Sequence, residues 1–368
     1  MNISLGIVGL PNVGKSTLFN AITNISVPAE NYPFCTIDPN IGVVEVKDGR
    51  LEKLSNISKS LKTVYPVVEF VDIAGLVKGA AKGEGLGNKF LSNIKNCDAI
   101  IHIIRAFEST SILHVENRVD PLSDKQIIET ELILKDLESI EQKIIKLSKD
   151  AKRDKDAKLK YDFLNQMKAH LEKGFLALDF LIPDGVDADA QKLFRGELFL
   201  ITDKPTLYLL NIDDVIFDEK SLVKKYRELL NLDDNKIIIP INIKQEFELS
   251  ILDKEERELM SKELGIEFSA INTVINAGYD LLGLMTYFTS GEQESRGWTI
   301  EKNSNAQEAA GVIHTDFFNK FIAAEVVSFN DFLEFGGWTK CKEYGKVRLE
   351  GKTYIVKDGD VMIFKHGA

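Results

Sequence analysis

The segment Gly9–Thr17 reads GLPNVGKST and matches the pattern GxxxxGK(S/T), which is typical of a loop that binds nucleotide phosphates. Glycines in such a loop let backbone N–H groups point at a phosphate, and the N-terminus of the following helix adds a favourable field. We expect Lys15 to contact the β- and γ-phosphates and Ser16 to coordinate Mg²⁺. The predicted nucleotide-binding residues of this loop are Gly9, Asn12, Val13, Gly14, Lys15, Ser16 and Thr17.

A second motif with phosphate chemistry, Asp72–Gly75, fits DxxG and follows an apolar run. We expect Asp72 to hold Mg²⁺ through a bound water and the backbone N–H of Gly75 to sense the γ-phosphate. Thr36 is the candidate second metal-binding hydroxyl, with an ordinary loop threonine as the alternative. The glycine-rich stretch from Gly75 to Gly87 is typical either of a switch ordered by γ-phosphate contacts or of a plain flexible loop.

The residue directly after DxxG is Leu76, where many GTPases have a glutamine that orients the attacking water. Because leucine cannot hydrogen-bond to water, either hydrolysis is slow or another group positions the water. Asn12 is a candidate to coordinate a monovalent cation such as K⁺; the alternative is an asparagine that only shapes the loop. His114, in a loop after the fourth predicted strand, is a candidate catalytic or switch residue, although a lone loop histidine is usually a surface residue. The catalytic candidates are therefore Lys15, Gly75, Leu76 and His114.

The segment Asn211–Asp214 lies where GTPases carry NKxD, the motif that reads guanine. In that motif the aspartate accepts hydrogen bonds from the base and the lysine covers it. Ile212 replaces the lysine, whereas Asp214 keeps the acidic group, so the sequence leaves both ATP and GTP open. Asn242 and Ile243 occupy the place of the loop whose backbone contacts the purine edge.

Six apolar runs indicate the strands that position these motifs. Continuous Val, Ile and Leu runs are typical of strands covered on both faces, and helical stretches lie between several of them. We therefore expect a doubly wound α/β sheet, with a helix over Lys15–Thr23. The predicted strands are Ile3–Val8, Ile41–Val46, Val67–Val71, Ala99–Ile104, Leu207–Leu210 and Ile237–Ile241.

The gap between the fourth and fifth runs is too long for one crossover and indicates an inserted helical arm. Two heptad-like stripes predict antiparallel helices around a polar tip over 149–160, and two ordinary amphipathic helices packed on the core are the alternative. The stripes are Ile133, Leu137, Ile140, Ile144 and Leu147, and Tyr161, Leu164, Leu171, Phe175 and Leu178. From about Leu284, a β-prone run at Thr286–Thr289, a helix-like stretch over Ala306–Phe321 and a glycine-punctuated tail indicate a small α+β module.

Composition excludes some classes of protein. The net charge of −11 argues against a surface coated in basic charge for nucleic acid, although it leaves room for a local basic patch. The three cysteines are few and widely spaced, so we expect neither a disulfide framework nor a metal knuckle, and a cytoplasmic location is the default. No apolar run approaches the length of a membrane span, so no membrane partner is expected.

Together these motifs resemble the YchF subgroup of the Obg-related P-loop GTPases over essentially the whole chain. The blocks that carry the resemblance are GLPNVGKSTLFNAIT (Gly9–Thr23), NYPFCTIDPN (Asn31–Asn40), DIAGLVKGAAKGEGLGNKFL (Asp72–Leu91), the helical insertion and FNKFIAAEVVSFNDF (Phe318–Phe332). The resemblance implies a nucleotide-binding domain over 1–125 and 200–283, a coiled-coil arm over 126–199, and a C-terminal TGS domain, a small β-grasp-like module, over 284–368.

The resemblance also implies a preference for ATP over GTP, association with ribosomes, and a link to translation or stress responses. Two positions depart from the family pattern at the base-reading loops: Asp214 stands where the family usually has Glu, and Ile243 where it often has Ala. The family's hydrophobic substitution for the catalytic glutamine maps onto Leu76, and its proposed catalytic histidine maps onto His114.

Basic residues give modest support for a ribosome or RNA partner. The segment Glu141–Lys173 holds ten Lys/Arg against six Asp/Glu, although solvated helix faces explain this equally well. A second basic cluster in the last module comprises Lys340, Lys342, Lys346, Arg348 and Lys352. The sequence does not determine the oligomeric state.

Overall fold

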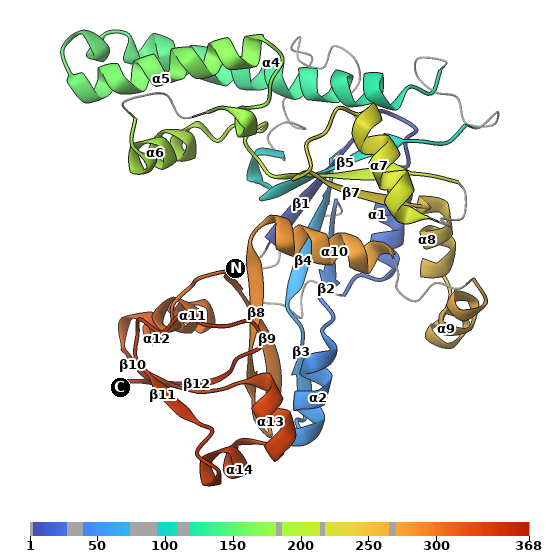
Figure 1. Ribbon diagram of the computed structural model, residues 1–368, viewed down its shortest axis with the longest axis vertical. Helices are drawn as coiled ribbons and strands as arrows, with labels where there is room; N and C mark the ends of the chain where they lie inside the picture. Colours follow the sequence, from blue (N-terminus) through green and yellow to red (C-terminus); the bar gives the residue numbers. More distant parts are fainter. Residues whose placement is uncertain are drawn as a thin grey trace.

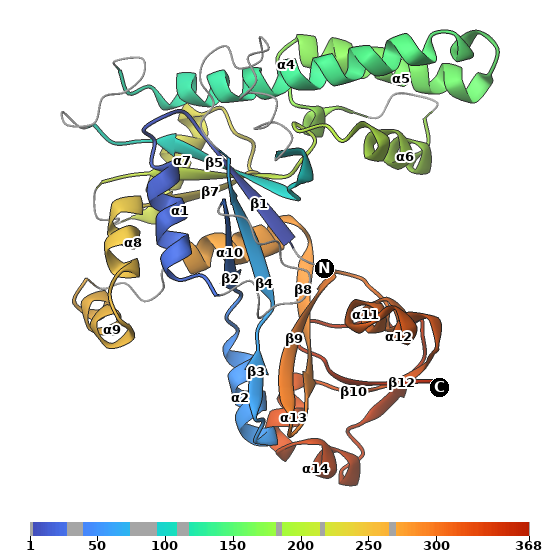
Figure 2. The same ribbon diagram turned by 180° about the vertical axis from the view of Figure 1, so that it is seen from behind.

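In the part of the chain that it describes, the computed structural model contains two β-sheets, the helices packed on them, and a long helical arm (Figure 1). Figure 2 shows the same arrangement from behind. The structure describes residues 3–27, 40–73, 94–108, 118–181, 186–213, 218–264 and 270–367.

The first sheet contains all six predicted strands, in the order β2-β4-β1-β5-β6-β7 within the described residues. Neighbouring strands are parallel except β2 and β4, which form an antiparallel pair at the edge. The strands are β1 (Ile3–Val8), β2 (Ile41–Glu45), β4 (Val67–Asp72), β5 (Ala99–Arg105), β6 (Thr206–Asn211) and β7 (Ile237–Ile241). The prediction of a doubly wound α/β sheet is confirmed, and its edge strand β2 runs antiparallel to β4.

Strand β6 shows why these strands read as continuous apolar runs. Leu207 and Leu209 belong to the main core cluster, whereas the alternate residues Tyr208 and Leu210 belong to a second cluster with Tyr226. Because successive side chains of a strand point to opposite faces, both faces of the sheet are covered by apolar groups. The helices around this sheet include α1 (Lys15–Asn24), α7 (Glu219–Leu229), α8 (Ile243–Ser250), α9 (Lys254–Glu263) and α10 (Ala270–Leu281).

The predicted arm is formed by α4 (Pro121–Leu147) and α5 (Lys155–Glu172), which lie side by side in both figures. Each of the two predictions for this segment, an antiparallel helical arm and helices packed on the core, holds for one half of α4. Its first half packs on the sheet, since Ile128 and Leu132 join the main core, and its second half packs on α5 through residues such as Ile140. None of the helices in the described part of the chain has the length and apolar character needed to cross a bilayer.

The predicted limits of the second arm helix are wrong at both ends. Helix α5 begins at Lys155 because the Asp154 side chain accepts from the N–H of Ala157 (2.9 Å), so the polar tip is shorter than 149–160. It ends at Glu172, so Phe175 and Leu178 lie beyond the helix. A third helix, α6 (Ala188–Leu198), adds Phe194 and Leu198 to the apolar core of the arm.

The second sheet has the order β11-β10-β12-β8-β9-β3 among the described residues. Its strands are β3 (Lys62–Val64), β8 (Leu284–Ser290), β9 (Glu294–Glu301), β10 (Phe321–Val327), β11 (Arg348–Glu350) and β12 (Val361–His366). The helices of this module are α11 (Ala306–Ile313), α12 (Thr315–Asn319), α13 (Phe329–Phe335) and α14 (Trp338–Glu343). The continuous helix predicted over Ala306–Phe321 is wrong, because His314 is extended (φ −162°, ψ 146°) and separates α11 from α12.

Strand β3 and helix α2 (Gly49–Ser58) come from the N-terminal part of the chain but lie beside β8 and β9 (Figures 1 and 2). Leu51 and Leu54 of α2 are fully buried in one cluster with Phe288 of β8. The sequence-based domain limits did not anticipate that this segment completes the C-terminal sheet.

Candidate nucleotide-binding site

Two positions in the loop between β1 and α1 have a backbone that glycine adopts most readily. Gly9 has φ +157°, and a Cβ there would lie 2.7 Å from the carbonyl oxygen of Ile103. Gly14 has φ +107°, and a Cβ there would lie 2.6 Å from the side-chain nitrogen of Asn211. Both distances are shorter than real Cβ contacts, so β5 and β6 both approach this loop too closely for a side chain.

Lys15, the first residue of α1, is 7% exposed. Its ammonium group donates hydrogen bonds to the carbonyl oxygens of Gly9 (2.8 Å) and Leu10 (2.7 Å), so the side chain folds back over the loop. Burial lowers the pKa of Lys15 to about 8, and the nearby carboxylate of Asp72 opposes this effect. Neutral carbonyls compensate a buried positive charge less well than phosphate oxygens do, so the site is suited to an anion.

Of the residues predicted to bind Mg²⁺, the structure describes Ser16 and Asp72. Ser16 is exposed in the first turn of α1, and Asp72 ends β4 in register with Ile7 of β1. Burial raises the pKa of Asp72, and the Lys15 ammonium opposes that rise. Hydroxyl and carboxylate groups are donors that Mg²⁺ prefers. A hydroxyl and a carboxylate are two ligands, so an Mg²⁺ ion held here would take its other ligands from phosphate and water.

Asn211, the last residue of β6, connects the phosphate loop to the loop after β7. Its side-chain nitrogen donates to the carbonyl oxygen of Val13 (2.9 Å), and its side-chain oxygen accepts from the N–H of Ile243 (3.3 Å). Asn242 caps α8, because its side chain accepts from the N–H of Gln245 (3.0 Å). The structure thus brings residues predicted for the phosphate end and for the base end close together. The nitrogen and the oxygen of the Asn211 side chain both take part in holding the two loops to each other.

A cavity of about 570 Å³ opens beside the phosphate loop, among the loops that follow β5, β6 and β7. The predicted residues that line it are Asn12, Gly14, Thr17, Asn211, Ile212, Asn242 and Ile243. Asn12 is exposed and has a left-handed backbone (φ +62°), and its role toward K⁺ stays a prediction. The cavity extends from the phosphate loop toward the base-reading segment, as a bound nucleotide would.

Phe107 also lines this cavity, and the sequence analysis missed it. The guanidinium carbon of Arg105 lies 4.4 Å from the centroid of the Phe107 ring, and Arg105 Nε donates to the Phe107 carbonyl oxygen (3.1 Å). An aromatic ring and the apolar Ile212 on the walls of one cavity suit the faces of a purine. In the sequence, Phe107 could have been recognised as an aromatic residue just after the fourth predicted strand. In the structure that strand, β5, pairs with β6, which carries the base-reading residue Asn211.

His102 of β5 lies near the site but belongs to the core. It is in register with Val8 and is 2% exposed. Burial lowers its pKa to about 3, and the charges of Lys125 and Lys15 act in the same direction. The imidazole is therefore neutral at physiological pH, and this histidine is a poor acid or base for hydrolysis.

Five predicted site residues lie outside the described residues: Thr36, Gly75, Leu76, His114 and Asp214. Their roles at the metal, the γ-phosphate, the attacking water and the base stay predictions.

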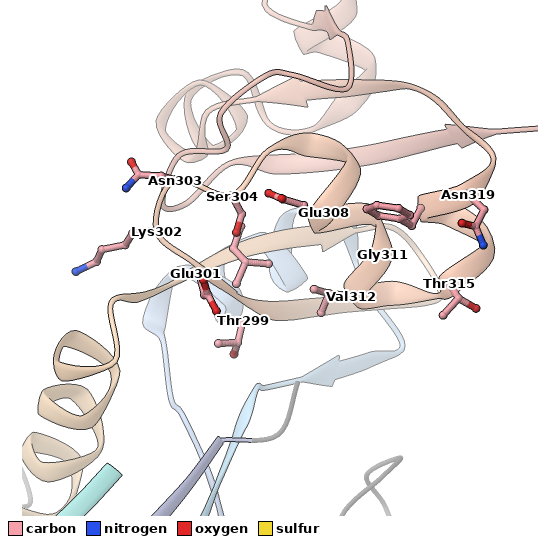
Figure 3. Close-up of a pocket in the computed structure, with 12 residues that line it drawn as sticks. Thr299, Glu301, Lys302, Asn303, Ser304, Glu308, Gly311, Val312, Thr315 and Asn319 are labelled. Carbon is pink, nitrogen blue, oxygen red and sulfur yellow. The ribbon is translucent and has the colours of Figure 1, made fainter. Parts of the chain in front are cut away.

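A larger cavity of about 780 Å³ lies on the C-terminal module (Figure 3). Its walls come from the end of β9, the following turn, α11 and α12. Two of its polar side chains have partners within the module or beside it: Lys302 pairs with Asp280 (3.2 Å), and Glu308 accepts from the N–H of Asn305 (2.8 Å) in a capping box. None of the described residues predicted to bind nucleotide lines this cavity, so the geometry of the phosphate loop, not cavity size, identifies the site.

A mostly parallel sheet with a GxxxxGKS loop between β1 and α1 defines the P-loop NTPase fold. The family model described as 50S ribosome-binding GTPase matches residues 4–149. The model named YchF-GTPase_C, described as a protein of unknown function, matches residues 284–367.

Similar proteins span the whole chain. The "Ribosome-binding ATPase YchF" of Bacillus subtilis (strain 168) is 49% identical over 371 residues, which cover 99% of each chain. The protein of the same name from Escherichia coli O157:H7 is 48% identical over 367 residues, again 99% of each chain. The solved structure of the Schizosaccharomyces pombe YchF GTPase is 36% identical, covers 99% of this chain and 98% of that chain, and superposes with a TM-score of 0.84. The chain therefore belongs to the YchF family of P-loop NTPases.

Proposed function

We propose that the chain is a cytoplasmic, Mg²⁺-dependent ATPase that changes conformation with its nucleotide and binds the ribosome in translation or stress regulation. The observation that carries the proposal is the buried Lys15 ammonium, folded onto two carbonyls of a glycine-shaped loop. The names of the bacterial relatives, which are ribosome-binding ATPases, support the choice of nucleotide and partner.

The phosphate end supplies the electrostatics of phosphoryl transfer, which depends mainly on positioning and on stabilising charge. In this proposal the Lys15 ammonium leaves the carbonyls of Gly9 and Leu10 for the β- and γ-phosphates, and the first N–H groups of α1 face the same phosphates. Mg²⁺, when bound, neutralises charge on the phosphate oxygens. Ser16 and Thr36 would hold it directly, and Asp72 would hold it through water.

The attacking water needs a polar group, since Leu76 offers none. We assign this role to His114, with the N–H of Gly75 at the γ-phosphate and K⁺ beside Asn12 as an added positive charge. Replacing His114 by Ala should then lower turnover while leaving nucleotide affinity nearly unchanged, and equal turnover in both proteins would rule out the assignment.

The base end supports a purine through Phe107 and the apolar Ile212, which stands where NKxD has lysine. Asp214 is proposed to meet the exocyclic group of the base. The competing function is a GTPase, favoured by the name of the fission yeast relative, a YchF GTPase. Titration of the Mg²⁺-loaded protein with fluorescent ATP and GTP analogues separates the two, and tighter binding of GTP would sink the ATPase assignment.

The arm tip is the surface we assign to the ribosome or RNA. Lys149, Lys152, Arg153 and Lys155 are exposed there. In the C-terminal basic cluster, by contrast, several charges are already paired within the module: Lys342 with Glu325, Lys346 with Asp331, and Arg348 with Glu350.

Cosedimentation with ribosomes tests this surface. Reversing the charge of Lys152 and Arg153 to Glu should weaken binding and flatten its salt dependence, because phosphate contacts release counterions. The matched control reverses Lys342 and Lys346, and a larger loss in that control would contradict the assignment. A third reading, a ribosome-binding module with negligible turnover, would be supported if ribosome binding required nucleotide while no multiple-turnover hydrolysis could be measured.

A further inference from the structure

The C-terminal module is joined to the first sheet at two separate places (Figures 1 and 2). One connection runs from α10 into β8. The other runs from β4 through β3 and α2 back to β2. The two connections meet the first sheet at different strands: α10 packs on β6 and β7 and reaches Leu5 of β1, whereas the other connection enters through β4, between β1 and β2.

The α10 connection is fixed to the body of the first sheet. Ile271, Val274 and Ile275 are buried in the main core, and a Cβ at Gly278 would lie 2.9 Å from Leu5 Cδ1. The turn from α10 to β8 passes through Gly283, which has φ +64° and open space where a Cβ would be. Its N–H donates to the Asp280 carbonyl oxygen (3.0 Å) on the α10 side, and its own carbonyl oxygen accepts from the N–H of Lys302 (2.7 Å) on the module side. A glycine with a left-handed backbone, placed between a firmly packed helix and the first strand of the module, is suited to act as a pivot.

The second connection begins at the phosphate site. Asp72 ends β4 beside Lys15, and β4 pairs with β2 from Ile41↔Val71 to Glu45↔Val67. The pair is extended by a hydrogen bond from the Val46 N–H to the Pro66 carbonyl oxygen (2.8 Å). The chain just before β4 is β3, which pairs with β9 of the C-terminal sheet, so consecutive strands belong to the two sheets.

The α2–β3 segment is packed into the C-terminal module as part of its core. A chain of hydroxyl groups crosses the contact: Ser58 to Ser290 (2.8 Å), Ser290 to Ser295 (2.7 Å), and Ser295 to Ser60 (2.8 Å). Ser295 is fully buried. Satisfied buried hydroxyls and a shared apolar cluster are typical of one rigid body, so this segment should move with the module.

Arg50 adds an ion-pair contact at the same place. Its guanidinium pairs with Asp48 (2.7 Å) at the start of α2 and with Asp358 (2.6 Å) of the C-terminal module, and it lies over the Phe288 ring at 5.2 Å. Asp358 also accepts from the N–H of Thr286 in β8 (3.1 Å). One side chain thus ties α2 to the strand that leads away from the pivot.

We propose that the C-terminal module has a different orientation in the ATP-bound and the ADP-bound protein. A shift of β4 at its Asp72 end would move β3, which is part of the module, and the module would rotate about Gly283. This inference rests on the proposed function, since it needs ATP and ADP to contact the Asp72 end of β4 differently. A shift of β4 by about 1–2 Å relative to α10 would move one connection and not the other, and the module must then rotate. By reciprocity, whatever holds the module must also bias the choice between ATP and ADP.

The first test measures the distance between spin labels at Lys224→Cys on α7 and Lys352→Cys on the module, in a Cys35→Ser background. Both label sites are exposed, and Cys97 and Cys341 are buried. A non-hydrolysable ATP analogue with Mg²⁺ should shift the distance by about 3 Å or more relative to ADP. If titration of the same samples shows that both nucleotides bind and the distance stays equal, the inference fails while the proposed function stands. If neither nucleotide binds, both fail.

The second test weakens the α2 contact far from the phosphates. Arg50→Met should change the ratio of ATP to ADP affinity by about threefold or more, while the control Lys262→Met, at an exposed position of α9, leaves it unchanged. Asp358→Asn removes the negative charge that pairs with Arg50 and keeps the shape of the side chain. It should shift the ratio of ATP to ADP affinity in the same direction as Arg50→Met. Circular dichroism and thermal melting check that each variant is folded. An unchanged affinity ratio in both folded variants would overturn the proposal.

Discussion

The two ends of the nucleotide site are built in different ways. At the phosphate end, Gly9, Gly14 and Lys15 lie within one short loop, and the lysine meets carbonyls of that same loop. At the base end, Phe107 lies just after β5, Asn211 ends β6, and Ile243 begins α8, which follows β7. A site made by one local segment can be recognised as a motif of consecutive residues. A site assembled from distant segments forms only when the sheet brings those segments together.

The contrast also separates two kinds of function. The phosphate end carries charge, so a change there should act on the reaction itself. The base end carries shape and apolar surface, so a change there should act mainly on affinity and on the choice of base. Substitutions at each end can therefore test whether this division is real.

The largest effect is expected at Lys15. Lys15→Ala removes the positive charge that we assign to the β- and γ-phosphates and should lower kcat/KM for ATP by about 100-fold or more. Steady-state hydrolysis with Mg²⁺ measures it. The control is Lys158→Ala, an exposed lysine of the arm that pairs with Asp162. Activity within about threefold of the parent protein would remove Lys15 from the catalytic machinery.

Gly14 is expected to matter for the geometry of the loop. Gly14→Ala places a methyl group 2.6 Å from the side-chain nitrogen of Asn211 on a backbone with φ +107°, so it should lower the free energy of unfolding by roughly 2–3 kcal/mol. Urea denaturation measures the change. Gly196→Ala is the matched control, because it lies inside α6 with open space around it and should stabilise by about 0.5–1 kcal/mol. Equal effects at both glycines would contradict the structure of the loop.

The sequence was a good guide wherever the relevant contacts are local. Apolar runs located every strand of the first sheet, and the GxxxxGKS motif placed Lys15 at the start of a helix. It failed where segments far apart in the sequence come together: β3 pairs with β9, and Phe107 lines one cavity together with Asn211 and Ile243. The interruption at His314 was missed because the stretch around it has helical composition, and only its extended backbone separates α11 from α12.

Asn211 lies where the two ends meet. Asn211→Ala leaves the Val13 carbonyl and the Ile243 N–H without their side-chain partner, which should weaken ATP and ADP alike by roughly tenfold, or about 1–2 kcal/mol. Isothermal titration with both nucleotides measures it. Asn165→Ala, which removes an amide bonded to the Tyr161 carbonyl oxygen on α5, is the control. A loss confined to one of the two nucleotides would mean that Asn211 reads the ligand instead of joining the loops.

The smallest effect is expected at Phe107. Phe107→Ala removes one apolar wall of the base cavity and should weaken ATP binding by about fivefold, close to 1 kcal/mol, with kcat nearly unchanged. Phe107→Tyr keeps the ring and should bind within about twofold of the parent protein. Phe199→Ala, at an exposed phenylalanine of the arm, is the control.

Binding of inorganic triphosphate, which lacks a base, gives a sharper test of the role of Phe107. Inorganic triphosphate has no ring to place in the cavity, so its affinity should be the same in Phe107→Ala and the parent protein. Lys15→Ala, in contrast, should weaken triphosphate and ATP together. If Phe107→Ala weakened inorganic triphosphate as much as ATP, the phenylalanine would support the phosphate loop through β5. The division between a charged end and an apolar end would then be wrong, because both ends would act through one shared strand.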